Sequence, residues 1–306
     1  MYYLSVVDNE APVVLTNVTK KFGSTTAVES VSWAPRLGQV TALVGLNGAG
    51  KSTLMRVITG LIKPTQGEVS VADTANGRAL SAMIEAPALY SGLSVQRNLL
   101  IHCTLTGAGP GDIPRVAELA QIENVLAKRV GTLSQGYRQR VAIAIALLGS
   151  PRTLLLDEPT NALDPQAIVQ LRGLIRRVAD EGTAVVVSSH QLRELEGTAD
   201  ALTLLHEGQI RYDGPFASFV GPPSLRVRVV DKHAGHTLLE LLKAGGIHGE
   251  LDSEGIQVTQ DTGDTDKTAY RVFATAADAG IGLVELSHIT PTLEEAFRLA
   301  IAGAQS

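Results

Sequence analysis

The stretch Gly45-Leu46-Asn47-Gly48-Ala49-Gly50-Lys51-Ser52-Thr53 decides the fold that we expect for this chain. It follows an apolar run, residues 40–44, whose composition predicts a strand. It precedes residues 54–58, whose pattern predicts the first turns of a helix. A strand, a glycine-rich turn and a helix in this order form a phosphate-binding loop when the turn reads G-x-x-x-x-G-K-[ST].

The residue types of this loop suit the binding of a phosphate chain. The glycines let backbone N–H groups converge on an anion, and the helix start adds unpaired donors and the positive end of its dipole. Lys51 is expected to reach the β- and γ-phosphates, and the Ser52 hydroxyl is expected to bind Mg²⁺. A turn without function is the weaker alternative, because every fixed position is present. The loop predicts that a nucleoside triphosphate binds to Gly45, Asn47, Gly48, Ala49, Gly50, Lys51, Ser52 and Thr53.

Two adjacent carboxylates, Asp157 and Glu158, follow a fully apolar run at residues 153–156. Such a run predicts a central parallel strand that is buried on both faces. Two acids at its end are costly unless a cation or a reaction uses them. Beside a phosphate-binding loop, we expect Asp157 to hold Mg²⁺ and Glu158 to polarise the attacking water as a general base. The alternative is that both acids cap the following segment.

His190 follows a second buried strand pattern, residues 184–187. Ligands of parallel α/β sheets gather at the carboxyl ends of the strands, so His190 is placed to meet the γ-phosphate. A histidine in a loop is more often simply solvated, and only its position after this strand supports the functional interpretation.

Two further features precede or follow the loop. Phe22 lies ahead of it, and the sequence leaves open whether this ring stacks on an adenine or packs in the core. The segment 132–140 predicts the start of a helix, with Ser134 as its N-cap and Gly136 permitting close backbone approach. A helix start without a bulky side chain can receive an anion, although by itself this segment predicts only a capped helix.

The composition narrows the class of protein. The chain has 306 residues, a formal net charge of −5 and one cysteine, Cys103. The acidic balance argues against broad nucleic-acid binding, and the single cysteine excludes a disulfide framework. The N-terminus lacks the pattern of a secretory signal, and no segment approaches the ~20 apolar residues of a membrane span. A function at a membrane would therefore be exercised from its surface, with other subunits supplying the spans.

The chain divides into segments of different pattern. We expect a leader at 1–12, an α/β nucleotide-binding domain at 13–220, a linker at 221–224 and an accessory domain at 225–306. Helical patterns at 95–105, 113–126 and 137–148 predict a helical subdomain, about 94–148, inserted into the α/β core. The last domain reads βαββαβ, which predicts a small ferredoxin-like fold with a regulatory or dimer-supporting role.

Together these residues resemble the ATP-binding subunit of an ATP-binding-cassette (ABC) transporter, over roughly residues 13–220. Residues 45–53 are similar to the Walker A motif, and 154–158 to Walker B with its catalytic glutamate. Residues 161–164, which end in Asp164, resemble the D-loop. His190 is similar to the switch histidine, Phe22 to the adenine-stacking aromatic, and 133–140 to the signature motif LSGGQ-x-Q-R. The resemblance implies a phosphate-loop NTPase fold with a parallel core sheet, an antiparallel β part and the helical subdomain.

The chain departs from the family pattern at two places. Gln135 and Tyr137 replace the usual Gly and Gln of the signature, whereas Ser134 and Gly136, the positions expected to touch the γ-phosphate, are retained. Glu85 stands where the Q-loop glutamine is expected, and this carboxylate is still able to bind Mg²⁺ or water. With glutamate at this position, the chain resembles the subunits of bacterial exporters that are associated with lantibiotic immunity and peptide-antibiotic resistance.

The resemblance also implies a mechanism. Two copies would close head to tail, with each ATP between one Walker A loop and the partner's helix start at Ser134–Gly136. ATP and Mg²⁺ are the implied cofactors, and integral membrane permease subunits are the implied partners. The implied location is the inner face of the cell membrane, and the implied task is export of a drug, peptide or lipid.

Two alternatives remain at this point. A soluble ABC-type ATPase that acts on ribosomes or DNA ranks lower, because the chain has a single cassette, no heptad insertion and no basic tail. A catalytically weak ATP-binding module would follow if Glu85 and the altered signature abolished turnover.

Overall fold

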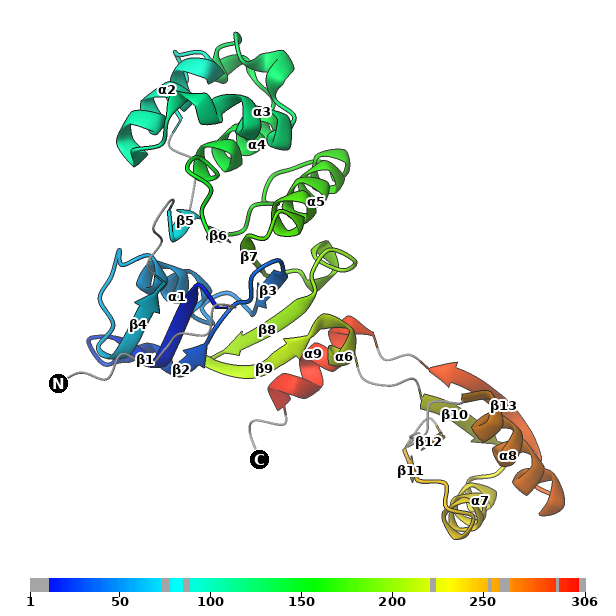
Figure 1. Ribbon diagram of the computed structural model, residues 1–306. Helices are drawn as coiled ribbons and strands as arrows, with labels where there is room; N and C mark the ends of the chain where they lie inside the picture. Colours follow the sequence, from blue (N-terminus) through cyan, green and yellow to red (C-terminus); the bar gives the residue numbers. More distant parts are fainter. Residues whose placement is uncertain are drawn as a thin grey trace. The chain divides into compact units, whose positions relative to one another are not determined.

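The computed structural model describes residues 11–72, 78–84, 89–220, 224–252, 255–258, 265–289 and 292–302 (Figure 1). Its contacts divide the chain into two compact units, Met1–Phe216 and Ala217–Ser306. Each unit has a sheet and a hydrophobic cluster of its own. The short helix α6 (Phe216–Phe219) contains the point of division.

A six-stranded sheet forms the centre of the first unit, in the order β5-β6-β7-β3-β8-β9. All neighbouring pairs are parallel except β8 and β9, which form an antiparallel pair. The strands are β3 (Val40–Val44), β5 (Leu80–Met83), β6 (Thr153–Leu156), β7 (Ala184–Ser189), β8 (Ala201–His206) and β9 (Gln209–Pro215). Every residue of β3, β6 and β7 is buried, as their continuous apolar runs predict. The α/β class predicted from the sequence is confirmed.

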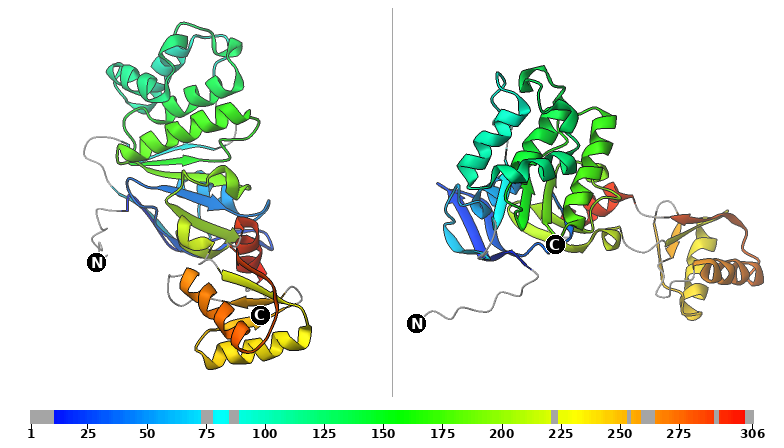
Figure 2. Two further views of the ribbon diagram at one scale, coloured as in Figure 1. Left: turned by 90° about the vertical axis from the view of Figure 1, so that its right-hand side faces the viewer. Right: turned by 45° about the horizontal axis from the view of Figure 1, so that its top comes forward.

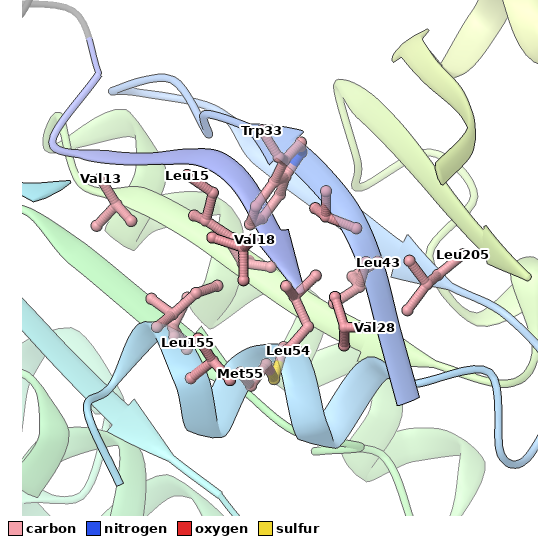
Figure 3. Packing of buried hydrophobic residues seen from close by; sticks show 14 residues of the cluster. Val13, Leu15, Val18, Val28, Trp33, Leu43, Leu54, Met55, Leu155 and Leu205 are labelled. Atoms are coloured by element: carbon pink, nitrogen blue, oxygen red, sulfur yellow. The ribbon is translucent and has the colours of Figure 1, made fainter. Parts of the chain in front are cut away.

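A three-stranded antiparallel sheet, in the order β2-β1-β4, belongs to the same unit. Its strands are β1 (Val13–Phe22), β2 (Thr25–Trp33) and β4 (Gln66–Val71). Helix α1 (Lys51–Ile58) shares one hydrophobic cluster with both sheets, and its Leu54 and Met55 are fully buried (Figure 3). The helix that follows the glycine-rich loop is therefore packed against both sheets, which fixes the position of the loop.

Four further helices of the first unit are α2 (Val95–Thr106), α3 (Ile113–Ala120), α4 (Gln135–Ala146) and α5 (Pro165–Asp180). Helix α4 contacts α2, α3 and α5, and Figure 2 shows these helices gathered beside the main sheet. In the described residues, the chain between β5 and β6 is built from α2, α3, α4 and short 3₁₀ turns.

The helical pattern at 113–126 corresponds to two pieces, α3 at Ile113–Ala120 and a 3₁₀ turn at Glu123–Val125. Helix α3 ends at Ala120 because Gln121 takes a left-handed conformation with φ of 55°. The Ile122 amide then donates to the Ala117 carbonyl at 2.9 Å, the bond that closes a helix after a left-handed residue. Ile122 itself is fully buried, so burial of its side chain opposes a further helical turn.

The second unit has the element order β10, α7, β11, β12, α8, β13, followed by α9. Its strands β10 (Ser224–Val229), β11 (Gly249–Leu251), β12 (Ile256–Val258) and β13 (Leu283–Ile289) pair antiparallel in the order β11-β12-β10-β13. Helices α7 (Lys232–Ala244) and α8 (Thr265–Asp278) contribute to one core with the sheet. This is the predicted ferredoxin-like βαββαβ arrangement, and α9 (Leu293–Ala302) follows it.

The helices within the described ranges are all too short or too polar to span a lipid bilayer.

Candidate functional site

The glycine-rich loop lies where β3 ends and α1 begins. Gly50 immediately precedes the helix. Its φ is 106°, a backbone conformation that residues other than glycine rarely adopt. A Cβ atom at Gly50 would lie 2.3 Å from the carbonyl oxygen of Ala27 on β2. The close approach of β2 and the positive φ both require glycine at this position. The structure therefore explains why the motif has a glycine here.

The Lys51 side chain folds back over the loop. Its Nζ donates to the Gly45 carbonyl oxygen at 2.7 Å and lies 3.8 Å from Oε1 of Glu158. The residue is 6% exposed, and burial lowers the pKa of Lys51, although the nearby Glu158 and Asp157 carboxylates oppose this shift. A phosphate entering here would meet a partly desolvated ammonium, whose attraction for an anion is stronger than that of a fully hydrated one.

Glu158 and His190 face each other across the ends of two adjacent strands. His190 Nδ1 lies 2.8 Å from Oε2 of Glu158, and His190 Nε2 lies 3.2 Å from Nε2 of Gln191. Strands β6 and β7 pair in parallel, with Leu156 opposite Val187, so their exit loops meet at one edge of the sheet. Three residues that are far apart in sequence, Lys51, Glu158 and His190, therefore share one site.

A cavity of about 410 Å³ lies over the loop. It is lined by Ala27, Asn47, Gly48, Ala49, Gly50, Lys51, Ser52, Thr53, Glu158, Asn161 and His190. The set contains seven of the eight predicted loop residues together with the predicted base and histidine. Asn161, which belongs to the segment that resembles the D-loop but was not itself predicted as a site residue, also lines this cavity.

Ser188 is a site residue that sequence reasoning did not assign. Its hydroxyl donates to Oδ1 of Asp157 at 2.5 Å and accepts from the Glu158 backbone N–H at 2.8 Å, and the residue is fully buried. A single hydroxyl thus fixes both the Asp157 carboxylate and the backbone of Glu158, which has φ of 48°. A small polar residue at the end of an otherwise apolar buried strand was the available signal.

Glu194 makes a second connection between the same two strand exits. Its Oε2 accepts from the hydroxyls of Thr160 at 2.6 Å and Ser189 at 3.2 Å. Arg172 donates to the backbone carbonyl oxygens of Glu194 and Arg193. These bonds hold the segment after Glu158 and the segment around His190 in one arrangement.

Replacing Ser188 with valine tests the first of these connections. The buried Asp157 carboxylate loses a donor and the Glu158 N–H loses its acceptor, so the triphosphate hydrolysis that the sequence predicts should slow by about tenfold to a hundredfold. Ser188→Thr keeps the hydroxyl and should restore most of the rate. Steady-state phosphate release checks both variants, and equal rates for valine and threonine would contradict the positioning role.

The predicted residues of the signature segment lie outside this cavity. Ser134 caps α4 by accepting from the Tyr137 N–H at 3.4 Å, and its own surface is exposed. A Cβ at Gly136 would lie 3.1 Å from Cβ of Ala167, near the start of α5. Asp164 caps α5 by accepting from the Ala167 N–H at 2.8 Å. Ser134, Gly136 and Asp164 are absent from the lining residues of the cavity over the loop.

Phe22 and Glu85 are the remaining predicted site residues. Phe22 is 51% exposed at the end of β1, so it does not pack in the core, and the Lys20 ammonium lies 5.0 Å from its ring centre. Phe22 is not among the lining residues of the cavity. Glu85 lies outside the described residues.

A buried parallel sheet with a glycine-rich loop, a lysine and a carboxylate at its carboxyl edge defines a phosphate-loop NTPase. The chain matches the family model described as "ABC transporter" over residues 28–161. A second model, described as "AAA domain, putative AbiEii toxin, Type IV TA system", matches residues 129–196.

Curated relatives extend the match beyond these models. The chain is 37% identical over 206 residues to the lantibiotic transport ATP-binding protein SrtF of Streptococcus pyogenes, covering 65% of this chain and 90% of that protein. It is 37% identical over 210 residues to the bacitracin transport ATP-binding protein BcrA of Bacillus licheniformis, covering 66% of this chain and 69% of that protein. This chain belongs to the family of ABC transporter ATP-binding proteins. It is the ATP-binding subunit of an ABC transporter and an ATPase.

Solved structures agree with the fold. The structure titled "Structure of ATP binding subunit of ABC transporter" has a TM-score of 0.59 and 28% identity, covering 68% of this chain and 91% of that chain. A nucleotide-free ATP-binding cassette from an ABC transporter has a TM-score of 0.61 at 24% identity, covering 67% of this chain and 91% of that chain. At 24% identity, the likeness to this second structure shows a shared fold and nothing further. The predicted family, fold class and ATPase activity are confirmed.

Proposed function

We propose that this chain powers a bacterial exporter in which two copies close head to tail on ATP and drive a drug, peptide or lipid through separate membrane subunits. The names of its relatives support transport, and one of them, the Nod factor protein, states export. Two are lantibiotic and bacitracin transport proteins, and a third is the Nod factor export ATP-binding protein I of Neorhizobium galegae, 33% identical over 231 residues. The proposed location is the inner face of the cell membrane, with no nucleic-acid partner.

The observation that carries the proposal is the shared position of Lys51, Glu158 and His190 at the glycine-rich loop. Backbone N–H groups and Lys51 would hold the triphosphate and stabilise the charge that develops on it. Glu158 would accept a proton from the attacking water, and His190 would stay oriented by its contact with Glu158. Glu158 is 3.8 Å from Lys51, so the base and the phosphate-binding cation are within reach of the same ligand.

Magnesium fits the donors that the chain offers. The Ser52 hydroxyl and the Asp157 carboxylate are hard oxygen donors, and Mg²⁺ is usually held by one or two such groups together with substrate phosphates. The described residues contain no cluster of three metal-ligating His, Cys, Asp or Glu side chains. Bound Mg²⁺ would neutralise charge on the phosphates. The position of Asp157 for this task would be fixed by Ser188.

A second copy of the chain would complete the site. Ser134 is exposed at the start of α4, and neither Ser134 nor Gly136 lines the cavity of its own chain. We assign Ser134 and Gly136 to the γ-phosphate held by the other copy, and Asp164 to the contact between the two sites. We also assign Phe22, with its exposed ring, to stacking on adenine, and Glu85 to water or Mg²⁺ near the triphosphate.

Recovery of the native complex tests the proposed task. The tagged chain is purified from detergent-solubilised membranes of its own cells, and we expect an integral membrane protein to co-purify and to change the rate of ATP hydrolysis. Recovery of ribosomal RNA or DNA without any membrane protein would contradict transport and favour the soluble alternative.

A further inference from the structure

The start of α4 carries a cation whose position is unusual. Arg138 is the fourth residue of the helix, close to the positive end of the helix dipole, which disfavours a basic side chain. The first turn has no acidic residue to offset this effect. Among the described residues, no carboxylate forms an ion pair with Arg138.

Gln135 holds this guanidinium at the helix start. Its Oε1 accepts from Nε of Arg138 at 3.2 Å and from Nη2 at 2.9 Å. The two residues are three positions apart on one helix, so the bond draws the long arginine side chain back toward the N-terminus of α4. One amide oxygen engages only part of the guanidinium, which leaves further N–H groups for an outside acceptor.

The next arginine of the same helix shows a different arrangement. Arg140 is 8% exposed and bonds through Nη2 to Oε1 of Gln170 at 2.7 Å and through Nη1 to the Gln121 carbonyl oxygen at 3.3 Å. Its guanidinium also lies 5.6 Å from the ring centre of Tyr137. Arg140 therefore has structural partners within its own chain, whereas the hydrogen bonds of Arg138 to side chains of the described residues go to the exposed Gln135 alone.

We propose that Gln135 is a positioning residue that holds Arg138 over the start of α4, where its guanidinium contacts the triphosphate bound by the other copy of the chain. This inference rests on the head-to-tail dimer proposed above. The cation is unfavourable beside the helix dipole of its own chain, but it becomes favourable when a triphosphate of several negative charges arrives at the same helix end. Gln135, which replaces the usual glycine of the signature, thus lets Arg138 add a contact to the partner's nucleotide beside those assigned to Ser134 and Gly136.

Dimer formation is the quantity that this arrangement should change. All variants are made in a Glu158→Gln parent, and the dimer dissociation constant is measured by analytical ultracentrifugation at saturating Mg-ATP. Arg138→Gln should weaken the dimer by about tenfold, because each dimer loses two cation–phosphate contacts. Gln135→Met, which keeps length and helix propensity, should weaken it several-fold. The double variant should be no weaker than Arg138→Gln alone, because Gln135 acts through Arg138.

Two controls separate this effect from a general loss of structure. Arg36→Gln removes the same charge at an exposed position just before β3, at the opposite end of that strand from the loop, and should leave the dimer unchanged. ATP affinity, measured with a fluorescent ATP analogue at protein concentrations too low for dimers, should be the same in all variants, because each chain's own loop is intact.

Several results would overturn the inference. An unchanged dimer constant in Arg138→Gln would remove the cation from the interface, and fully additive effects of the two substitutions would show that Gln135 does not act through Arg138. Both results require a parent that dimerises. A Glu158→Gln parent that stays monomeric would instead contradict the proposed head-to-tail dimer itself.

Discussion

Glu158→Gln is expected to lower the rate of ATP hydrolysis by about a hundredfold or more while leaving ATP binding intact. The amide keeps the shape of the side chain, but it cannot accept the proton of the attacking water. Glu158 Oε2 lies 2.8 Å from His190 and its Oε1 lies 3.8 Å from Lys51, so the substitution removes one charge from the centre of the site. Removing this carboxylate also lowers the repulsion that a triphosphate meets on binding.

The same variant should accumulate as an ATP-bound dimer, because the closed dimer forms and hydrolysis no longer reopens it. Light scattering with and without Mg-ATP measures the mass, and phosphate release measures the rate. Glu118→Gln on α3 is a matched control, since this carboxylate is exposed and far along the chain from the loop. A variant that hydrolyses ATP at the parental rate would remove Glu158 from the role of general base.

Lys51→Ala is expected to weaken ATP binding by about tenfold to a hundredfold, because a charge-assisted hydrogen bond to phosphate is worth ~1.5–3 kcal/mol. Hydrolysis should fall further, to background, since the charge on the γ-phosphate grows in the transition state. The Lys51 ammonium is 6% exposed and partly desolvated, and burial lowers its pKa, so its charge interacts with an anion through little solvent.

Equilibrium binding of a labelled nucleotide and phosphate release check this prediction separately. Lys63→Ala is the matched control, because Lys63 is exposed and lies beyond the end of α1. The fold should persist in both variants, as α1 is held by the buried Leu54 and Met55 rather than by Lys51. A hydrolysis rate that Lys51→Ala leaves unchanged would mean that the chain is an inactive binding module and that another protein supplies the activity.

Much of the fold was predictable because its strands and caps have strong local signals. Strand β3 occupies the expected residues 40–44, and Ser134 caps α4 as its sequence context predicts. The end of α3 was not predictable, since Gln121 has no sequence signal for its left-handed conformation. The residue that follows it, Ile122, is fully buried, and this burial depends on tertiary packing.

Some residues of the site were likewise predictable from the sequence, and others were not. The loop residues, Glu158 and His190 follow from motif order, because parallel strands deliver their carboxyl ends to one edge. The hydroxyl of Ser188 and the carboxylate of Glu194 were missed, because their roles arise from hydrogen bonds between two strand exits. No single segment of sequence records such a pairing. The exposure of Phe22 also became known only from the structure.

The central claim is that each ATP is held by the loop of one copy and the α4 start of the other. Mixing two inactive variants tests it most directly. Lys51→Ala disables the loop, and Ser134→Trp places a bulky ring at the exposed α4 start. In a mixed head-to-tail dimer, one site carries both changes and the other carries neither. Phosphate release should therefore rise on mixing toward about a quarter of the parental rate, since half of the dimers are mixed and each has one intact site. A mixture that stays as inactive as its two components would contradict the account.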